Sequence, residues 1–315
     1  MSESEFFPKW ILEAINKNPG QPNPKSKVFF EKMLELFPHF NNSFLTIPTT
    51  SDVGILKTHD QNELHAKFGI DSPNELILLT AFELFHFQAT YQIRELGLSL
   101  LNALEEGRFY VSAITTRAML EVVCINYFTF RRVDEKFKKC VGYLQAAAKT
   151  KSKSERQKIL TKYSQESLEV FSLIFNANTS SSINWSNYMH ERFDIKIPES
   201  GNSKKIHVNT AIEDMEKKSK LPLFSAYSIL SEFVHPNAGS KMLVTNTKNP
   251  HNPLMDSLRI GDNKSNAEAV LFYFDHISEA TYYTWTLALT LFHRGQDLLI
   301  ALDHLVPVAN SRQVH

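Results

Sequence analysis

Two short segments of this chain hold residue types that carry out acid–base and anion-binding chemistry. In the first, Tyr227, Ser231 and His235 follow one another at intervals of four residues within a helical pattern that ends at Pro236. This spacing places the three side chains on one face of a helix. A phenol, a hydroxyl and an imidazole on one face can serve as acid, base or ligand, because histidine changes charge near neutral pH. The alternative is that His235 caps a helix that Pro236 ends.

The second segment places a charged pair inside an apolar helical stretch. Arg117 and Glu121 are four residues apart and are surrounded by alanine, methionine, leucine and valine. Because buried charges need partners, one interpretation is a structural ion pair. The other is that Arg117 is presented in a pocket, where its guanidinium binds a phosphate group and Glu121 orients it.

A basic segment adds a third candidate for anion binding. Residues 131–162 contain eleven basic and three acidic side chains, a local charge of +8 in a chain with 34 of each sign overall. Lysines such as Lys138 and Lys139 would contact and steer a polyanion such as RNA. Asn237, two residues after His235, is a further candidate for ligand binding. The alternative is an ordinary solvated helix face.

The two helical patterns together resemble a known group of proteins. A helix with a small residue, Arg117 and Glu121, followed by Tyr227-x-x-x-Ser231-x-x-x-His235-Pro, resembles a bacterial family of unknown function that is grouped with the HEPN-like helical superfamily. The resemblance covers roughly residues 75–300. It implies an up-and-down helical bundle, commonly dimeric, and many members of that superfamily are ribonucleases of toxin or phage-defence systems.

The chain departs from the catalytic signature of that superfamily, which is an arginine followed after four to six residues by a histidine. The positions that would hold the arginine before His235 are Ser228, Ile229 and Leu230. We therefore expect binding of RNA or a nucleotide, in a site lined by Arg117, Glu121, Tyr227, Ser231 and His235. Catalysis is left open as a metal-independent, ribonuclease-like activity in which Arg117 replaces the missing arginine.

Two other classes of protein fit parts of the same pattern. Glu83-x-x-His86 and Glu232-x-x-His235 are Glu-x-x-His pairs of the kind that carboxylate-bridged di-metal bundles use. Pro236 puts the second pair at a helix end, so we expect no metal and no cofactor. The remaining alternative is a structural or protein-interaction bundle without a ligand.

The elements that position these residues are predicted to be almost entirely helical. Apolar residues recur at three- and four-residue spacing over long stretches, and Gly and Pro are scarce. The pattern predicts an all-α fold, a bundle of long antiparallel helices over 73–106, 108–133 and 266–305, with a helix at 221–235 against them. Gly107 is predicted to end the first of these helices, and residues 134–175 are predicted to continue as one or two helices with a break near Thr150. We expect an N-terminal helical cap and loop (1–72), a main domain (73–305) and a flexible tail (306–315).

Composition limits the cellular context. Cys124 and Cys140 are too few for a disulfide scaffold, and we expect both in the core of a protein from a reducing compartment. The chain shows no secretory signal and no run of about 18 apolar residues, so we expect a cytoplasmic protein without a membrane span. Helices this long and rich in Phe and Leu also predict a homodimer.

Overall fold

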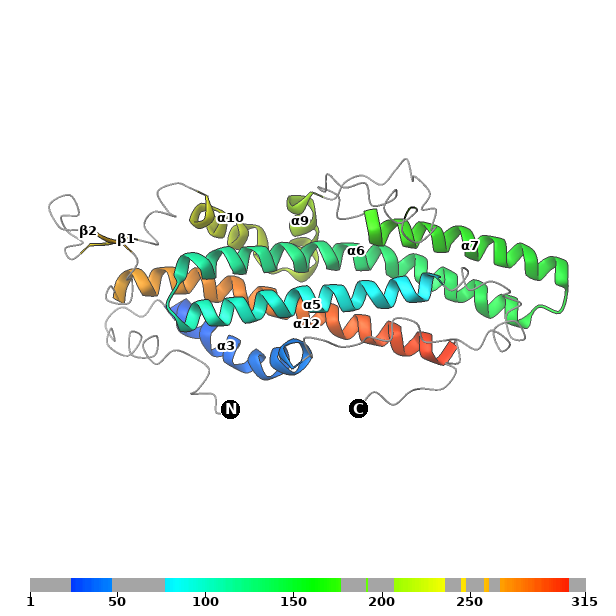
Figure 1. Ribbon diagram of the computed structural model, residues 1–315, viewed down its shortest axis with the longest axis horizontal. Coiled ribbons are helices and arrows are strands. Elements are labelled where there is room, and N and C mark those ends of the chain that lie inside the picture. Colours follow the sequence, from blue (N-terminus) through cyan, green and yellow to red (C-terminus); the bar gives the residue numbers. More distant parts are fainter. Residues whose placement is uncertain are drawn as a thin grey trace. The chain divides into compact units, whose positions relative to one another are not determined.

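The computed structural model describes residues 24–46, 77–176, 191, 207–235, 245–247, 258–260 and 267–305. Its helices are α3 (Pro24–Phe40), a π-helical turn η1 (Asn41–Leu45), α5 (Ile77–Glu105), α6 (Phe109–Lys149), α7 (Lys153–Asn176), α9 (Val208–Ser219), α10 (Leu223–Val234) and α12 (Ala267–Leu305). Two short strands, β1 (Thr245–Thr247) and β2 (Leu258–Ile260), pair antiparallel with Thr245 opposite Ile260. The predicted all-α helical bundle is confirmed (Figure 1). No described helix is long and apolar enough to cross a membrane.

The turn between α5 and α6 follows from one glycine. Gly107 has φ of 70°, a left-handed conformation that costs glycine little. Its N–H donates to the Leu104 carbonyl at 3.0 Å, and the N–H of Arg108 donates to the Ala103 carbonyl at 2.8 Å. These two bonds form a Schellman motif, which ends a helix by satisfying its last carbonyls. The predicted helix stop at Gly107 is confirmed, and α6 begins two residues later.

Helix α6 is longer than the sequence pattern predicted. The expected end near Val133 is wrong, because the helix continues to Lys149 and spans 41 residues. Residues 134–149 contain no proline, and alanines such as Ala146 and Ala147 favour continuation of the helix. The predicted break near Thr150 is confirmed, because the chain turns at residues 150–152. There the Ser152 hydroxyl accepts a hydrogen bond from the Glu155 N–H at 3.4 Å at the start of α7.

The chain divides into two compact units. Unit 1 comprises residues 1–47, 90–124 and 212–290, and unit 2 comprises residues 48–89, 125–211 and 291–315. Helices α5, α6, α9 and α12 each contribute residues to both units. The predicted boundary at residue 72 and the predicted tail at 306–315 lie outside the described residues and stay predictions.

In unit 1, α3 packs against α12 through aromatic rings. Phe29 lies edge-on to Tyr283, with ring centroids 5.6 Å apart, and Phe40 stacks on Trp285 at 4.5 Å and an interplanar angle of 11°. Phe40 and Trp285 are fully buried. Aromatic pairs of this kind contribute about 0.5–1.5 kcal/mol beyond their buried area. Buried aromatic contacts therefore hold this part of the predicted N-terminal cap to α12.

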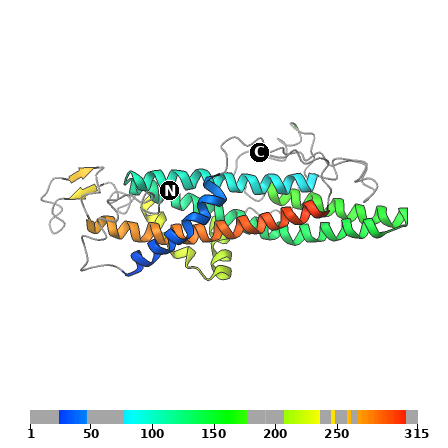
Figure 2. The same ribbon diagram turned by 90° about the horizontal axis from the view of Figure 1, so that it is seen from below.

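In unit 2, α7 runs back alongside the second half of α6 (Figures 1 and 2). The seam between them is apolar and fully buried, with residues contributed by both helices: Leu144, Ala147, Leu160, Tyr163 and Val170. Its apolar residues recur at three- and four-residue intervals on each helix, which is the spacing of one helix face. Helices α6 and α7 therefore form a hairpin whose turn is residues 150–152.

Both cysteines lie in the core, as predicted. Cys124 and Cys140 are buried and form no disulfide. Burial raises the pKa of the Cys124 thiol to about 12 and that of Cys140 to about 11. Because the thiolate is the reactive form, neither cysteine has the properties of a nucleophile or a metal ligand.

Candidate functional site

Helix α10 carries three of the five predicted site residues. It begins after Pro222 and ends at His235, whose ψ of 150° is extended because Pro236 disfavours the helical conformation at the preceding residue. Its buried side chains share one face of the helix: Leu223, Ala226, Leu230 and Phe233. Tyr227 lies half-buried beside that face. The apolar face thus sets the direction in which the Tyr227 phenol points.

The structure brings Tyr227 together with Arg117 and Glu121 of α6, within unit 1. Arg117 Nη2 donates to the Tyr227 hydroxyl at 3.0 Å, and that hydroxyl donates to Glu121 Oε1 at 2.9 Å. Arg117 Nε lies 3.1 Å from the same carboxylate oxygen, and the guanidinium carbon lies 5.1 Å from the centre of the Tyr227 ring. We call these three residues the tyrosine bridge.

The tyrosine bridge uses its own polar groups internally. The Arg117 and Glu121 side chains are 20% and 29% exposed, so the pair is partly shielded from water. Arg117 Nε is buried and makes no hydrogen bond among the described residues despite its closeness to Glu121, so that contact is an ion pair only. A phosphate group that bound Nη2 or Nε of Arg117 would have to displace Tyr227 or Glu121. This geometry favours the structural interpretation of Arg117 and Glu121.

The other predicted residues do not join the bridge through a described contact. The Ser231 hydroxyl donates to the Tyr227 carbonyl of its own helix at 2.8 Å. His235 is exposed, and its N–H donates to the Ser231 carbonyl at 3.0 Å as the helix cap. Within the described part of the chain, the His235 imidazole makes no hydrogen bond. Asn237 lies outside the described residues.

The first half of the basic segment is largely neutralised by carboxylates of unit 2. Lys136 contacts both Glu166, at 3.2 Å, and Glu169 across the α6–α7 seam. Burial lowers the pKa of Lys136, but hydrogen bonds to Glu169 and Glu166 outweigh that effect and leave the pKa raised. Lys138 pairs with Asp134 at 2.6 Å, and Lys139 lies 3.9 Å from Glu166. The predicted ligand-binding lysines Lys138 and Lys139 therefore already have acidic partners.

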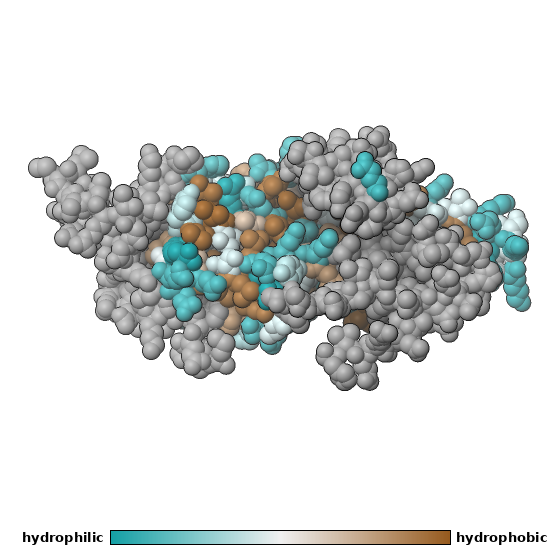
Figure 3. All heavy atoms as spheres, viewed as in Figure 1, coloured by the Kyte–Doolittle hydropathy of each residue, from teal (hydrophilic) through white to brown (hydrophobic). Residues whose placement is uncertain are grey.

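The second half is different, and we call it the basic tip, because it surrounds the turn of the hairpin. It contains six basic residues: Lys149, Lys151, Lys153, Arg156, Lys158 and Lys162. Its only acidic residue is Glu155, which gives residues 149–162 a net charge of +5. All five lysines are exposed, and none makes an ion pair or side-chain hydrogen bond within the described residues. Figure 3 shows hydrophilic residues around the turn that joins α6 to α7.

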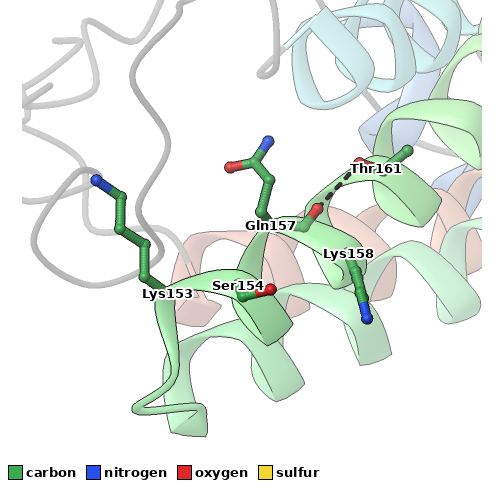
Figure 4. Close-up of a pocket in the computed structure, with 5 residues that line it drawn as sticks. All are labelled: Lys153, Ser154, Gln157, Lys158 and Thr161. Atoms are coloured by element: carbon green, nitrogen blue, oxygen red, sulfur yellow. Dashed lines mark hydrogen bonds between the residues drawn. The ribbon is translucent and has the colours of Figure 1, made fainter.

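An open hollow borders the first turns of α7. It has a volume of about 570 Å³ and is lined, among the described residues, by the side chains shown in Figure 4: Lys153, Ser154, Gln157, Lys158 and Thr161. The Thr161 hydroxyl donates to the Gln157 carbonyl at 2.9 Å, whereas Ser154 and Gln157 make no side-chain hydrogen bond in the described part of the chain. Near the hollow, the Lys153 ammonium group lies on the same side of α7 as the Gln157 amide, whereas the Lys158 side chain extends to the other side (Figure 4).

The sequence pattern predicted one basic segment over 131–162 and did not distinguish the basic tip from the rest of it. One signal was present, because Glu155 is the only acidic residue between positions 140 and 165. The carboxylates that neutralise the first half, Glu166 and Glu169, lie about thirty residues away along the chain. Only the pairing of α6 with α7 brings them to Lys136.

The described residues contain no group of three or more His, Cys, Asp and Glu side chains that could hold a metal ion. The Glu83 side chain lies outside the description, so the Glu-x-x-His pair of α5 is known only through His86. His86 belongs to unit 2 and His235 to unit 1. Nothing in the described geometry favours the di-metal alternative.

No family model, curated protein or solved structure matches this chain. The HEPN-like resemblance therefore stays a prediction. A function for this chain has to be argued from its own contacts and charges, and the basic tip and the tyrosine bridge are the two features that bear on it.

Proposed function

We propose that this protein binds RNA through the basic tip of the α6–α7 hairpin. The observation that carries the proposal is the group of five exposed lysines that have no acidic partner among the described residues, in a chain with no net charge. Lysines without internal partners can neutralise phosphates and release their counterions, which supplies most of the affinity in sequence-independent nucleic-acid binding. The contact surface is thus narrower than the whole segment 131–162.

The contrast between the two halves of the segment supports this proposal. Lys136, Lys138 and Lys139 each lie within 4 Å of a carboxylate, so binding a phosphate there would compete with an existing ion pair. Among the described residues, no carboxylate pairs with Lys153 or Lys158, so a phosphate meets no such competition from them. A polyanion therefore gains more at the turn of the hairpin than along the seam.

The proposal is tested by comparing substitutions of lysines that have an acidic partner with substitutions of lysines that have none among the described residues. Binding of a fluorescent single-stranded RNA to the full chain is measured by anisotropy between 50 and 200 mM salt for wild type, Lys153→Gln, Lys158→Gln and the matched control Lys138→Gln. We expect each tip variant to weaken binding and to reduce the salt slope by about 0.7, the effect of one lost phosphate contact on a single strand. Lys138→Gln should change both quantities much less, because Lys138 is paired with Asp134.

Two outcomes would count against the proposal. Equal effects of Lys138→Gln and the tip variants would mean that only the total charge matters. Wild-type protein without salt-dependent RNA binding would leave the structural alternative, a helical bundle without a ligand, which the hydrogen bonds of Tyr227 to Arg117 and Glu121 favour.

Catalysis remains a separate hypothesis attached to Arg117, Glu121 and His235. If the chain cleaves RNA as the HEPN-like resemblance suggests, His235→Ala should abolish cleavage and leave the free energy of unfolding nearly unchanged, because the imidazole is exposed. If His235 only ends α10, the same variant should change neither activity nor stability appreciably, because the cap hydrogen bond to the Ser231 carbonyl comes from the backbone N–H, which alanine keeps. The expected homodimer and cytoplasmic location are also still predictions, and light scattering tests the first.

A further inference from the structure

We propose that the hollow on α7 is a subsite that holds one nucleotide unit of the bound RNA, with its phosphate on Lys153 and its sugar or base on Gln157. This inference rests on the proposed RNA binding and adds a defined position on the tip where one nucleotide is recognised. A diffuse set of lysines would attract RNA without any such position.

The size of the hollow suits this ligand. The hollow is open to solvent and has a volume of about 570 Å³, which leaves room for a ligand larger than a single ion beside Lys153. A single phosphate ion needs only a small part of this space. The remaining room matches a larger group attached to the phosphate, which in RNA is the nucleoside.

The chemistry of the lining residues suits a nucleotide as well. Lys153 supplies an ammonium group without a carboxylate partner in the described part of the chain, and the Ser154 hydroxyl beside it in sequence is also free. Lys153 is the first residue of α7, where the positive end of the helix dipole adds to the attraction of an anion. The Gln157 amide has both donors and an acceptor, the combination that reads a base edge or a ribose hydroxyl.

The directions of the side chains assign the two roles. Figure 4 shows Lys153 and Gln157 extending to the same side of α7, whereas Lys158 extends to the opposite side. Lys153 and Gln157 are four residues apart, so they lie one turn apart on one helix face. The phosphate and nucleoside of one unit can therefore contact these two residues together, while Lys158 is placed to meet a neighbouring phosphate.

A neutral substitution separates this subsite from general charge attraction. Binding of the same fluorescent RNA to the full chain is compared for wild type, Gln157→Ala, Ser154→Ala and the control Gln145→Ala, which changes an exposed glutamine of α6 outside the hollow. We expect Gln157→Ala to weaken binding about two- to tenfold, as loss of one hydrogen bond does, with an unchanged salt slope. Ser154→Ala should have a smaller effect in the same direction, and Gln145→Ala none.

Competition with AMP and with adenosine distinguishes the source of the nucleotide. Displacement of RNA by AMP and not by adenosine would show that the hollow also takes a free nucleotide and needs its phosphate. A weakened Gln157→Ala variant without AMP competition would restrict the subsite to a nucleotide within an RNA chain. If Gln157→Ala and Ser154→Ala bind like wild type while Lys153→Gln binds more weakly, the subsite is refuted and the proposed function stands. If wild type binds no RNA, the proposed function itself fails.

Discussion

The hydroxyl of Tyr227 on α10 lies 2.9 Å from Glu121 Oε1 on α6 and donates a hydrogen bond to it. The same hydroxyl accepts a hydrogen bond from Arg117, so one phenol oxygen uses its donor and an acceptor position at once. Arg117 and Glu121 already form an ion pair within α6. Tyr227 therefore fastens α10 to a charged pair that α6 makes by itself, in addition to the buried apolar face of α10.

Removal of this hydroxyl should loosen the attachment of α10. We expect Tyr227→Phe to lower the free energy of unfolding by about 1 kcal/mol, because both hydrogen bonds are lost while the ring and the ion pair remain. Urea denaturation measures the change. Tyr110→Phe is the matched control, since its hydroxyl donates to the Val234 carbonyl at the longer distance of 3.4 Å and should contribute less. A larger cost for Tyr110→Phe would contradict the assignment.

The tyrosine bridge shows what the sequence could predict of the site. The spacing of Arg117 and Glu121 predicted an intrahelical pair, and the spacing of Tyr227 and His235 predicted one helix face, because both depend only on 3.6 residues per turn. The meeting of Tyr227 with Arg117 depends on the packing of α10 against α6, which no local pattern specifies. The same limit applies to the lysines of the basic segment, whose partners lie on another helix.

The fold was predicted more fully than the site, for a similar reason. Helix periodicity and helix breakers such as Gly107 and Pro236 depend only on residues close together in the sequence. The C-terminal ends of α5 and α10 can therefore be predicted from sequence. The break after α6 was predicted near Thr150, but the predicted division at Val133 is wrong, because the residues near Val133 are charged without being helix breakers. The charge cluster there indicated a change of environment and not a change of backbone conformation.

Gly295 and Gly142 lie in opposite surroundings, so replacement of each by alanine should have opposite effects on stability. A Cβ at Gly295 on α12 would overlap the ring of His86, whereas a Cβ at Gly142 on α6 would have no neighbouring atom within 4 Å. We expect Gly295→Ala to cost about 1–3 kcal/mol through overpacking. Gly142→Ala should stabilise the protein by up to about 1 kcal/mol through helix propensity. Thermal unfolding measures whether each variant is more or less stable than wild type. Destabilisation by Gly142→Ala would contradict the open surroundings of Gly142.

His86 should make stability depend on pH. It is 4% exposed, packs against Phe292, and lies 3.3 Å from the Gln296 amide nitrogen. Burial lowers the pKa of His86 from 6.5 to about 4. The unfolded chain therefore binds this proton more readily than the folded chain. The stability that comes from keeping His86 neutral in the folded chain is fully present above pH 6.5 and is lost as the pH falls toward 4.

The size of the effect follows from the two pKa values. Between pH 7 and pH 5, protonation of His86 in the unfolded state should lower the free energy of unfolding by about 2 kcal/mol. His86→Gln removes the titrating group, so the difference between its unfolding free energies at pH 7 and pH 5 should be smaller than that of wild type by this amount. Equal pH dependence in the two proteins would show that His86 is not buried in its neutral form.

The carboxylate of Glu166 should limit RNA binding, because it lies 3.2 Å from Lys136 and 3.9 Å from Lys139. We expect Glu166→Gln to release both lysines in part and to raise RNA affinity about two- to fivefold at 0.1 M salt, with a steeper salt slope. Glu213→Gln makes the same change in net charge at an exposed position of α9 and should have a smaller effect. Anisotropy titrations at several salt concentrations compare the two variants. If both raise affinity equally, only the net charge of the protein matters, and the ion pairs of the α6–α7 seam do not confine RNA to the basic tip.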